Sequence, residues 1–173
     1  MKKISLLLTA LFALFAGTAF GQVTVSDSDD FNVSATILAE PVSIAEETGL
    51  DFGQVQQGGT ETIAYDSTAA GVMLITGTIG AEVYIQYPTT ISLSGDGVDL
   101  EVDVSAGTHT TVATSASAYV SEDPISLADI SGTGTMRLFI GGVLQDVGGG
   151  NIPNTASGVY SGTATITAQY NSF

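Results

Sequence analysis

The chain has 173 residues, with 18 Asp and Glu against three Lys and Arg, one His and no Cys. Apolar residues make up 44% of it and Gly contributes 21 residues, so the sequence is neither disordered nor collagen-like and is long enough for one domain. Nucleic acids and anionic membrane faces are excluded as partners, because the chain offers no basic surface to bind phosphate.

Residues 1–21 have the pattern of a secretory signal peptide. Two lysines precede an apolar run over residues 4–16, and Ala19 and Gly21 place small side chains at the −3 and −1 positions of a cleavage site. The run is shorter than the ~20 residues of a membrane-spanning helix. We therefore expect an exported chain of residues 22–173 without a membrane span or disulfide, located outside the cell, at its surface or in the periplasm. Its net charge would be −17, because one Arg then remains against 18 acidic residues.

Beyond residue 30 the chain consists of short runs in which apolar and polar residues alternate, separated by Gly, Pro, Asp and Ser. A period of two is typical of strands with one buried face. In chain order, strands are predicted over residues 31–37, 42–44, 50–55, 60–65, 72–76, 82–87, 90–93, 100–104, 109–114, 136–140, 143–147 and 162–170. A helical pattern is at best marginal and is confined to one turn within residues 122–130.

Gly141 and Gly142 separate two of these runs. Paired glycines supply the positive φ angles of a two-residue turn, so we predict a β-hairpin around them. Phe52 alternates with outward-facing residues and is predicted to fill the core. Short antiparallel strands at spacings near ten residues predict an all-β fold, an immunoglobulin-like (Ig-like) antiparallel β-sandwich, as a single domain of residues 22–173.

The sequence offers little catalytic chemistry. His109 is the only imidazole and has no Gly-x-Ser-x-Gly motif near it, so we interpret it as a solvent-exposed strand residue. There is no Cys, and no Lys follows the leader. The carboxylates are spread evenly and no Trp is available to stack on a sugar, which disfavours an acidic hydrolase. We expect a protein that is not an enzyme and has no cofactor.

Two acidic clusters are candidate calcium sites. One is Asp27-Ser28-Asp29-Asp30, and the other combines Asp96 and Asp99 with Glu101 and Asp103. Calcium is bound by several oxygen ligands, but neither cluster completes the twelve-residue loop with Gly at position six and Glu at position twelve. Repulsive surface charge is therefore the favoured interpretation, and no metal site is predicted.

Several segments, taken together and in order, resemble a family of secreted bacterial domains of unknown function, numbered four-four-zero-two, whose members look like pilins. The segments are Leu50-Asp51-Phe52-Gly53, Gly58-Gly59, residues 77–88, Ile140-Gly141-Gly142-Val143-Leu144, and Gly158-Val159-Tyr160-Ser161-Gly162 leading to Tyr170. The resemblance implies export, a β-sandwich and a fimbria-like surface subunit, and it implies no catalytic residue. Residues 100–132 carry no landmark of the family, so their strand order is left open.

The C-terminal segment is also similar to the end of chaperone-assembled fimbrial subunits. There a Gly is followed by alternating apolar residues and a Tyr near the terminus, and the matching residues here are Gly162, Ala164, Ile166, Ala168 and Tyr170. In such subunits an extended N-terminal segment of the next subunit completes an exposed sheet edge. The resemblance implies a periplasmic chaperone as a partner.

The candidate donor segment is residues 22–26, with Val23 and Val25 on one face. An equally weighted alternative is that the first and last strands pair within one subunit. The function predicted is a non-enzymatic, secreted, structural or adhesive surface subunit of a fimbrium that associates with itself or with related subunits. The alternative is a singly displayed extracellular module that binds calcium or a glycan.

Overall fold

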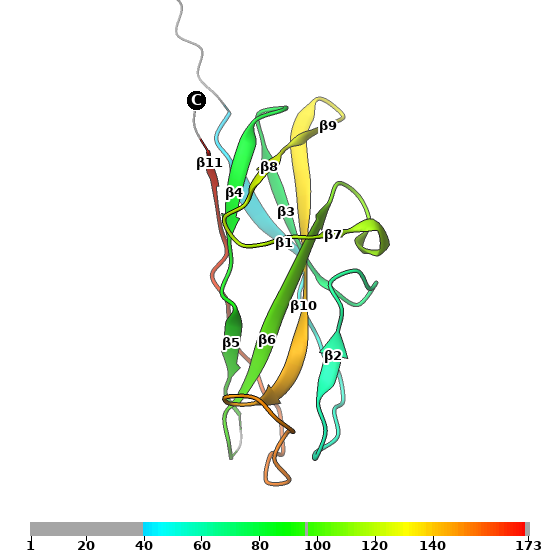
Figure 1. Ribbon diagram of the computed structural model, residues 1–173, viewed down its shortest axis with the longest axis vertical. Coiled ribbons are helices and arrows are strands. Elements are labelled where there is room, and N and C mark those ends of the chain that lie inside the picture. Colours follow the sequence, from blue (N-terminus) through cyan, green and yellow to red (C-terminus); the bar gives the residue numbers. More distant parts are fainter. Residues whose placement is uncertain (1–39, 96, 172–173) are drawn as a thin grey trace, which may run out of the picture. The chain divides into compact units, whose positions relative to one another are not determined.

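The computed structural model describes residues 40–95 and 97–171, and Figure 1 shows how their strands are arranged. All of these residues belong to one folded unit. Several predicted features lie outside the described residues, namely the signal peptide, Val23 and Val25, the cluster at residues 27–30, the strand over residues 31–37, and Asp96.

Most strands belong to one antiparallel sheet. Its main order is β1-β3-β10-β6-β5, with β2 and β9 pairing with β10 and β7 pairing with β6. The bounds are Ser43–Thr48 for β1, Glu61–Ile63 for β2, Gly71–Gly77 for β3, Thr90–Leu93 for β5, Leu100–His109 for β6, Ser117–Ala118 for β7, Ala128–Ile130 for β9 and Thr133–Asp146 for β10. The 14-residue β10 is the central strand, because four others pair with it.

A second antiparallel sheet has the order β11-β4-β8, formed by β4 (Glu82–Gln86), β8 (Pro124–Ser126) and β11 (Thr167–Tyr170). The alternation predicted for β4 is present, since Val83 and Ile85 are fully buried while both end residues are exposed. They share one core cluster with Ile75 of β3 and Leu138 of β10. The two sheets therefore pack face to face, and the predicted all-β, sandwich-like class is confirmed.

Tyr119 anchors the connection between β7 of the large sheet and β8 of the small sheet. Its hydroxyl accepts a hydrogen bond from the Ile85 amide at 3.0 Å and donates one to the Asp123 carbonyl at 2.7 Å. The side chain is buried, and its ring lies 6.2 Å from that of Tyr87. Burial raises the pKa of both tyrosines, because the charged phenolate would lose its hydration.

The hairpin predicted at Gly141 and Gly142 is wrong. Both glycines lie inside the continuous strand β10, and neither has a positive φ. Glycine is required at both positions because atoms of neighbouring segments lie where a Cβ would be. A Cβ on Gly141 would collide with the Ile63 carbonyl oxygen and lie 2.5 Å from the Tyr65 nitrogen, and one on Gly142 would lie 2.5 Å from Val102 Cγ1. The missing side chains allow β2 and β6 to pack against β10.

Other predicted boundaries also change. Residues 50–55 form no strand, and of residues 162–170 only β11 is paired as a strand. The runs at 100–104 and 109–114 are replaced by one strand, β6, followed by a 3₁₀ turn at Ala113–Ser115. The marginal helical turn within residues 122–130 is instead β8 and β9.

Candidate functional site

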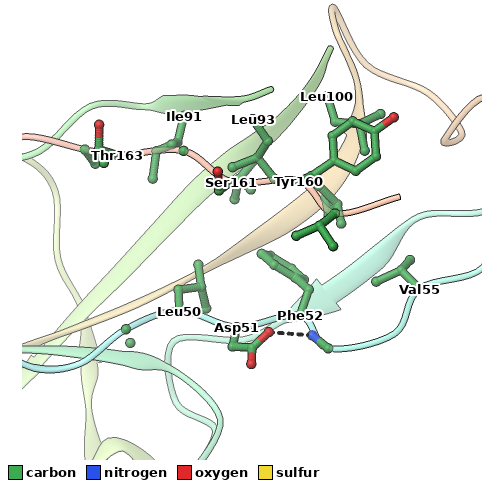
Figure 2. A pocket seen from close by; sticks show the side chains of 18 of the residues that line it. Leu50, Asp51, Phe52, Val55, Ile91, Leu93, Leu100, Tyr160, Ser161 and Thr163 are labelled. Atoms are coloured by element: carbon green, nitrogen blue, oxygen red, sulfur yellow. Dashed lines mark hydrogen bonds between the residues drawn. The ribbon is translucent and has the colours of Figure 1, made fainter. Parts of the chain in front are cut away.

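The described residues form a cleft of about 1040 Å³ with a largely apolar floor, shown in Figure 2. Residues 50–55 form one wall, and residues 158–166 form the other. Figure 2 shows Leu50, Phe52 and Val55 along one segment, and Tyr160, Ser161 and Thr163 along the segment opposite. The cleft thus lies between two stretches that the sequence predicted to be strands and that the structure leaves outside both sheets.

Apolar side chains from the large sheet and the loop after it form the floor of the cleft. The buried members are Leu100, Val102, Leu144, Ile152 and Ala156. A larger number of apolar side chains around them stay only partly buried: Leu50, Phe52, Val55, Ile91, Leu93, Val98, Val104 and Tyr160. A core in which most members keep contact with solvent can bury further apolar area when another chain covers it.

The first wall leaves its sheet because of a local turn. The Asp51 side chain accepts a hydrogen bond from the Gly53 amide at 2.8 Å, and Gly53 has a φ of 65°. This Asx-type turn bends the wall locally, and Figure 2 shows the Leu50 and Phe52 side chains pointing into the cleft. Farther on, the Gly58 amide donates to the Ile152 carbonyl at 2.8 Å and closes one end of the cleft.

The second wall is attached at its two ends. Ser161 and Ser94 exchange two backbone hydrogen bonds of 3.0 and 3.1 Å, and pairing with β4 resumes at Thr167. Residues 162–166 belong to no strand. A second hollow of about 550 Å³ lies between this segment and residues 86–92. Since residues 162–166 pair with no described strand, their backbone can pair with an added one.

Two sheet edges meet where the cleft begins. β1 pairs only with β3 among the described strands, and β11 only with β4, so each is an edge of its sheet. The two strands contact each other. Beyond that contact the chain after β1 and the chain before β11 form the two walls. The cleft is thus an open seam between the two layers of the sandwich.

The charges around the cleft are acidic. Glu46 and Asp51 are the only ionisable carboxylates among its described lining residues, and no Lys, Arg or His lines it. An anionic ligand would find no partner there, whereas a neutral apolar ligand would lose little hydration. The lining therefore favours an uncharged, largely apolar occupant.

The structure divides the C-terminal residues singled out in the sequence. Gly162, Ala164 and Ile166 line the cleft, and Ile166 also packs on the main core together with Ala168 and Tyr170. The Tyr170 hydroxyl donates to the Glu40 carbonyl at 2.6 Å and accepts from the Thr78 amide at 2.8 Å. Gly162 has no room for a side chain, because a Cβ would meet the Ser92 carbonyl oxygen.

His109 and the acidic cluster have structural partners. His109 Nδ1 accepts hydrogen bonds from the Thr111 and Val112 amides at 3.2 Å each, which fixes the turn after β6. The Glu101 carboxylate accepts from the Gly148 amide at 3.0 Å and so holds the loop after β10. Within the described part of the chain, no group of three or more His, Cys, Asp or Glu side chains is placed to hold a metal ion. No described helix is long and apolar enough to cross a membrane.

The cleft was not predicted from the sequence. Both walls have alternating apolar residues and were therefore expected to be strands, although an Asp followed two residues later by Gly is a local signal that separates residues 50–55 from β1. Ile152 and Ala156 were not singled out either, although both are buried in the floor. Comparisons with protein-family models, curated proteins and solved structures found no significant match to this chain.

Proposed function

We propose that the protein is a non-enzymatic structural or adhesive subunit of a bacterial surface fimbrium and associates with copies of itself or with related subunits. The observation that carries this proposal is the open apolar seam between β1 and β11. The signal peptide predicted from residues 1–21 would deliver the chain outside the cytoplasm. The resemblance to pilin-like domains supports the same function and suggests a chaperone that covers the seam before assembly.

An added β-strand fits this cleft better than a compact ligand does. A strand presents alternate side chains to one face, so its apolar half can contact the floor while its polar half faces solvent. The backbone of the added strand can pair with residues 162–166, which have no strand partner among the described residues. Together these features describe an acceptor site for strand addition.

The alternative, a singly displayed module that binds calcium or a glycan, has less support. Aliphatic side chains outnumber polar ones in the lining, and Phe52 and Tyr160 are its only described aromatic residues. Glycan sites usually present more aromatic faces than this for stacking on sugar rings. The described acidic residues also form no cluster suited to a metal ion.

The test is the mass distribution of the exported chain, measured by light scattering after gentle purification across a range of concentrations. We expect multimers that dissociate on dilution or a ladder of stable multimers. The variant Ala164→Asp places a charge on an exposed wall residue and should leave a folded monomer, whereas the matched variant Ala118→Asp, on the exposed β7, should assemble normally. A parent chain that is monomeric at all concentrations would contradict the proposal.

A further inference from the structure

We propose that the cleft accepts residues 31–37 of a second copy of this chain, and not residues 22–26. This inference rests on the proposed function and names the donor segment. Residues 31–37 read Phe-Asn-Val-Ser-Ala-Thr-Ile, so four apolar side chains alternate with three neutral polar ones. As a strand, such a segment has one fully apolar face and carries no charge.

The chemistry of the segment matches the cleft. Seven residues in a strand span about 23 Å at ~3.3 Å per residue. The apolar face would cover the partly buried side chains of the cleft, among them Leu50, Phe52 and Leu93. The polar face would point to solvent between the two walls. No charge would be buried, which suits a cleft without a basic residue.

Residues 22–26 are a poorer match. They supply only two apolar strand residues, Val23 and Val25, and Asp27, Asp29 and Asp30 follow at once. A strand of these residues would therefore bury about half as many apolar side chains in the cleft as residues 31–37 would.

The position of Glu40 favours donation to a second copy. The Glu40 amide donates to Thr78 Oγ1 at 3.1 Å, and its carbonyl accepts from the Tyr170 hydroxyl at 2.6 Å, so the described chain starts at the end of β11 that lies away from the cleft. For its own residues 31–37 to enter the cleft, the chain would have to reverse through Leu38 and Ala39. Neither is a residue type that favours tight turns. Donation to a neighbour requires no reversal.

Matched double variants of the full mature chain test this inference. Val33→Asp with Ala35→Asp should abolish assembly and give a monomer, because two carboxylates would enter the apolar cleft. Val23→Asp with Val25→Asp adds the same charge outside the proposed donor and should assemble like the parent. The opposite pattern would overturn the inference while leaving the proposed function intact. Normal assembly of both double variants would also overturn the inference.

A mixing experiment then separates donation between copies from insertion within one chain. The Val33→Asp, Ala35→Asp variant keeps an intact cleft, and Ala164→Asp keeps an intact donor segment. Each alone should be monomeric, and an equimolar mixture should form a 1:1 dimer that grows no further. A mixture that stays monomeric would show that the segment belongs to its own sandwich. The same conclusion would follow if the parent is a monomer and the Val33→Asp, Ala35→Asp variant melts at a lower temperature than the parent. In that second case the proposed function fails as well.

Discussion

Arg137 of β10 forms a bidentate ion pair with Glu47 of β1 across the intervening strand β3. The distances are 2.7 Å between Nε and Oε2 and 2.9 Å between the second guanidinium nitrogen and Oε1. The register shift in β1 falls at Glu47, between Glu46 and Thr48. Arg137 also donates to the Thr110 carbonyl at 2.6 Å, so it joins β1, β10 and the end of β6.

The ion pair predicts a dependence of stability on pH. The hydrogen bond from Arg137 holds the pKa of Glu47 below its usual value of 4.5. A depressed folded-state pKa contributes stability above the unfolded pKa, and that contribution is lost as the pH falls through the folded pKa. Since the two side chains are 24% and 34% exposed, Glu47→Gln should lower the free energy of unfolding by about 0.5 to 1 kcal/mol at pH 7.

Chemical denaturation of this variant at pH 7 and at pH 3 checks the prediction. The difference from the parent should shrink at the lower pH. Glu46→Gln is the matched control, because it removes the same charge next to the pair and should not destabilise the protein. An equal effect of Glu47→Gln at both pH values would contradict the ion-pair explanation.

A second prediction concerns Gly141. Gly141→Ala should reduce stability by about 1 to 3 kcal/mol, because its Cβ would meet backbone atoms of Ile63 and Tyr65 that cannot move without breaking the β2 pairing. Gly59→Ala should be nearly neutral, since nothing lies within 4 Å of its Cβ and its φ is not positive. Thermal melts of both variants provide the measurement. A neutral Gly141→Ala would favour the exposed turn that the sequence predicted.

Gly141 also shows why part of the fold could not be read from the sequence. A glycine is required both where φ is positive and where two backbones approach closely, and the second requirement depends on residues distant in the chain. The strands β4 and β5 were predicted almost to the residue, because more buried and more exposed residues alternate regularly along each of them. The same alternation occurs at residues 50–55, where the Asp51–Gly53 turn prevents sheet pairing. The cleft was missed for this reason.

Phe52 and Leu138 give the third prediction. Leu138 is fully buried, so Leu138→Ala should destabilise the protein by about 2 to 5 kcal/mol. Phe52 is only half-buried on the cleft wall, so the loss of stability caused by Phe52→Ala should be smaller than the ~3 to 5 kcal/mol expected of a core Phe. The same variant should weaken assembly more than it weakens the fold. Denaturation midpoints and multimer mass would be measured on the same samples. A Phe52→Ala variant that loses as much stability as Leu138→Ala but assembles normally would place Phe52 in an ordinary core.

Tyr170 supports the fourth prediction. Tyr170→Phe removes the partner of the Thr78 amide and the Glu40 carbonyl, which should reduce stability by about 1 to 3 kcal/mol. Tyr84→Phe, on the neighbouring strand β4, is the control and should change stability little, because the Tyr84 hydroxyl has no hydrogen-bond partner among the described residues. Equal melting temperatures for Tyr170→Phe and the parent would show that these hydrogen bonds do not anchor the chain at Glu40.

The central claim is that the cleft holds residues 31–37 of a neighbouring copy, and disulfide trapping tests it most directly because the chain has no native Cys. Ala35→Cys would be combined with Val55→Cys or with Ala164→Cys, one on each wall, and with the exposed Ala118→Cys as a control. On non-reducing gels we expect a ladder of covalent multimers from at least one wall pair and none from the control pair. Cross-links confined to single chains, or equal cross-linking of wall and control pairs, would contradict the account.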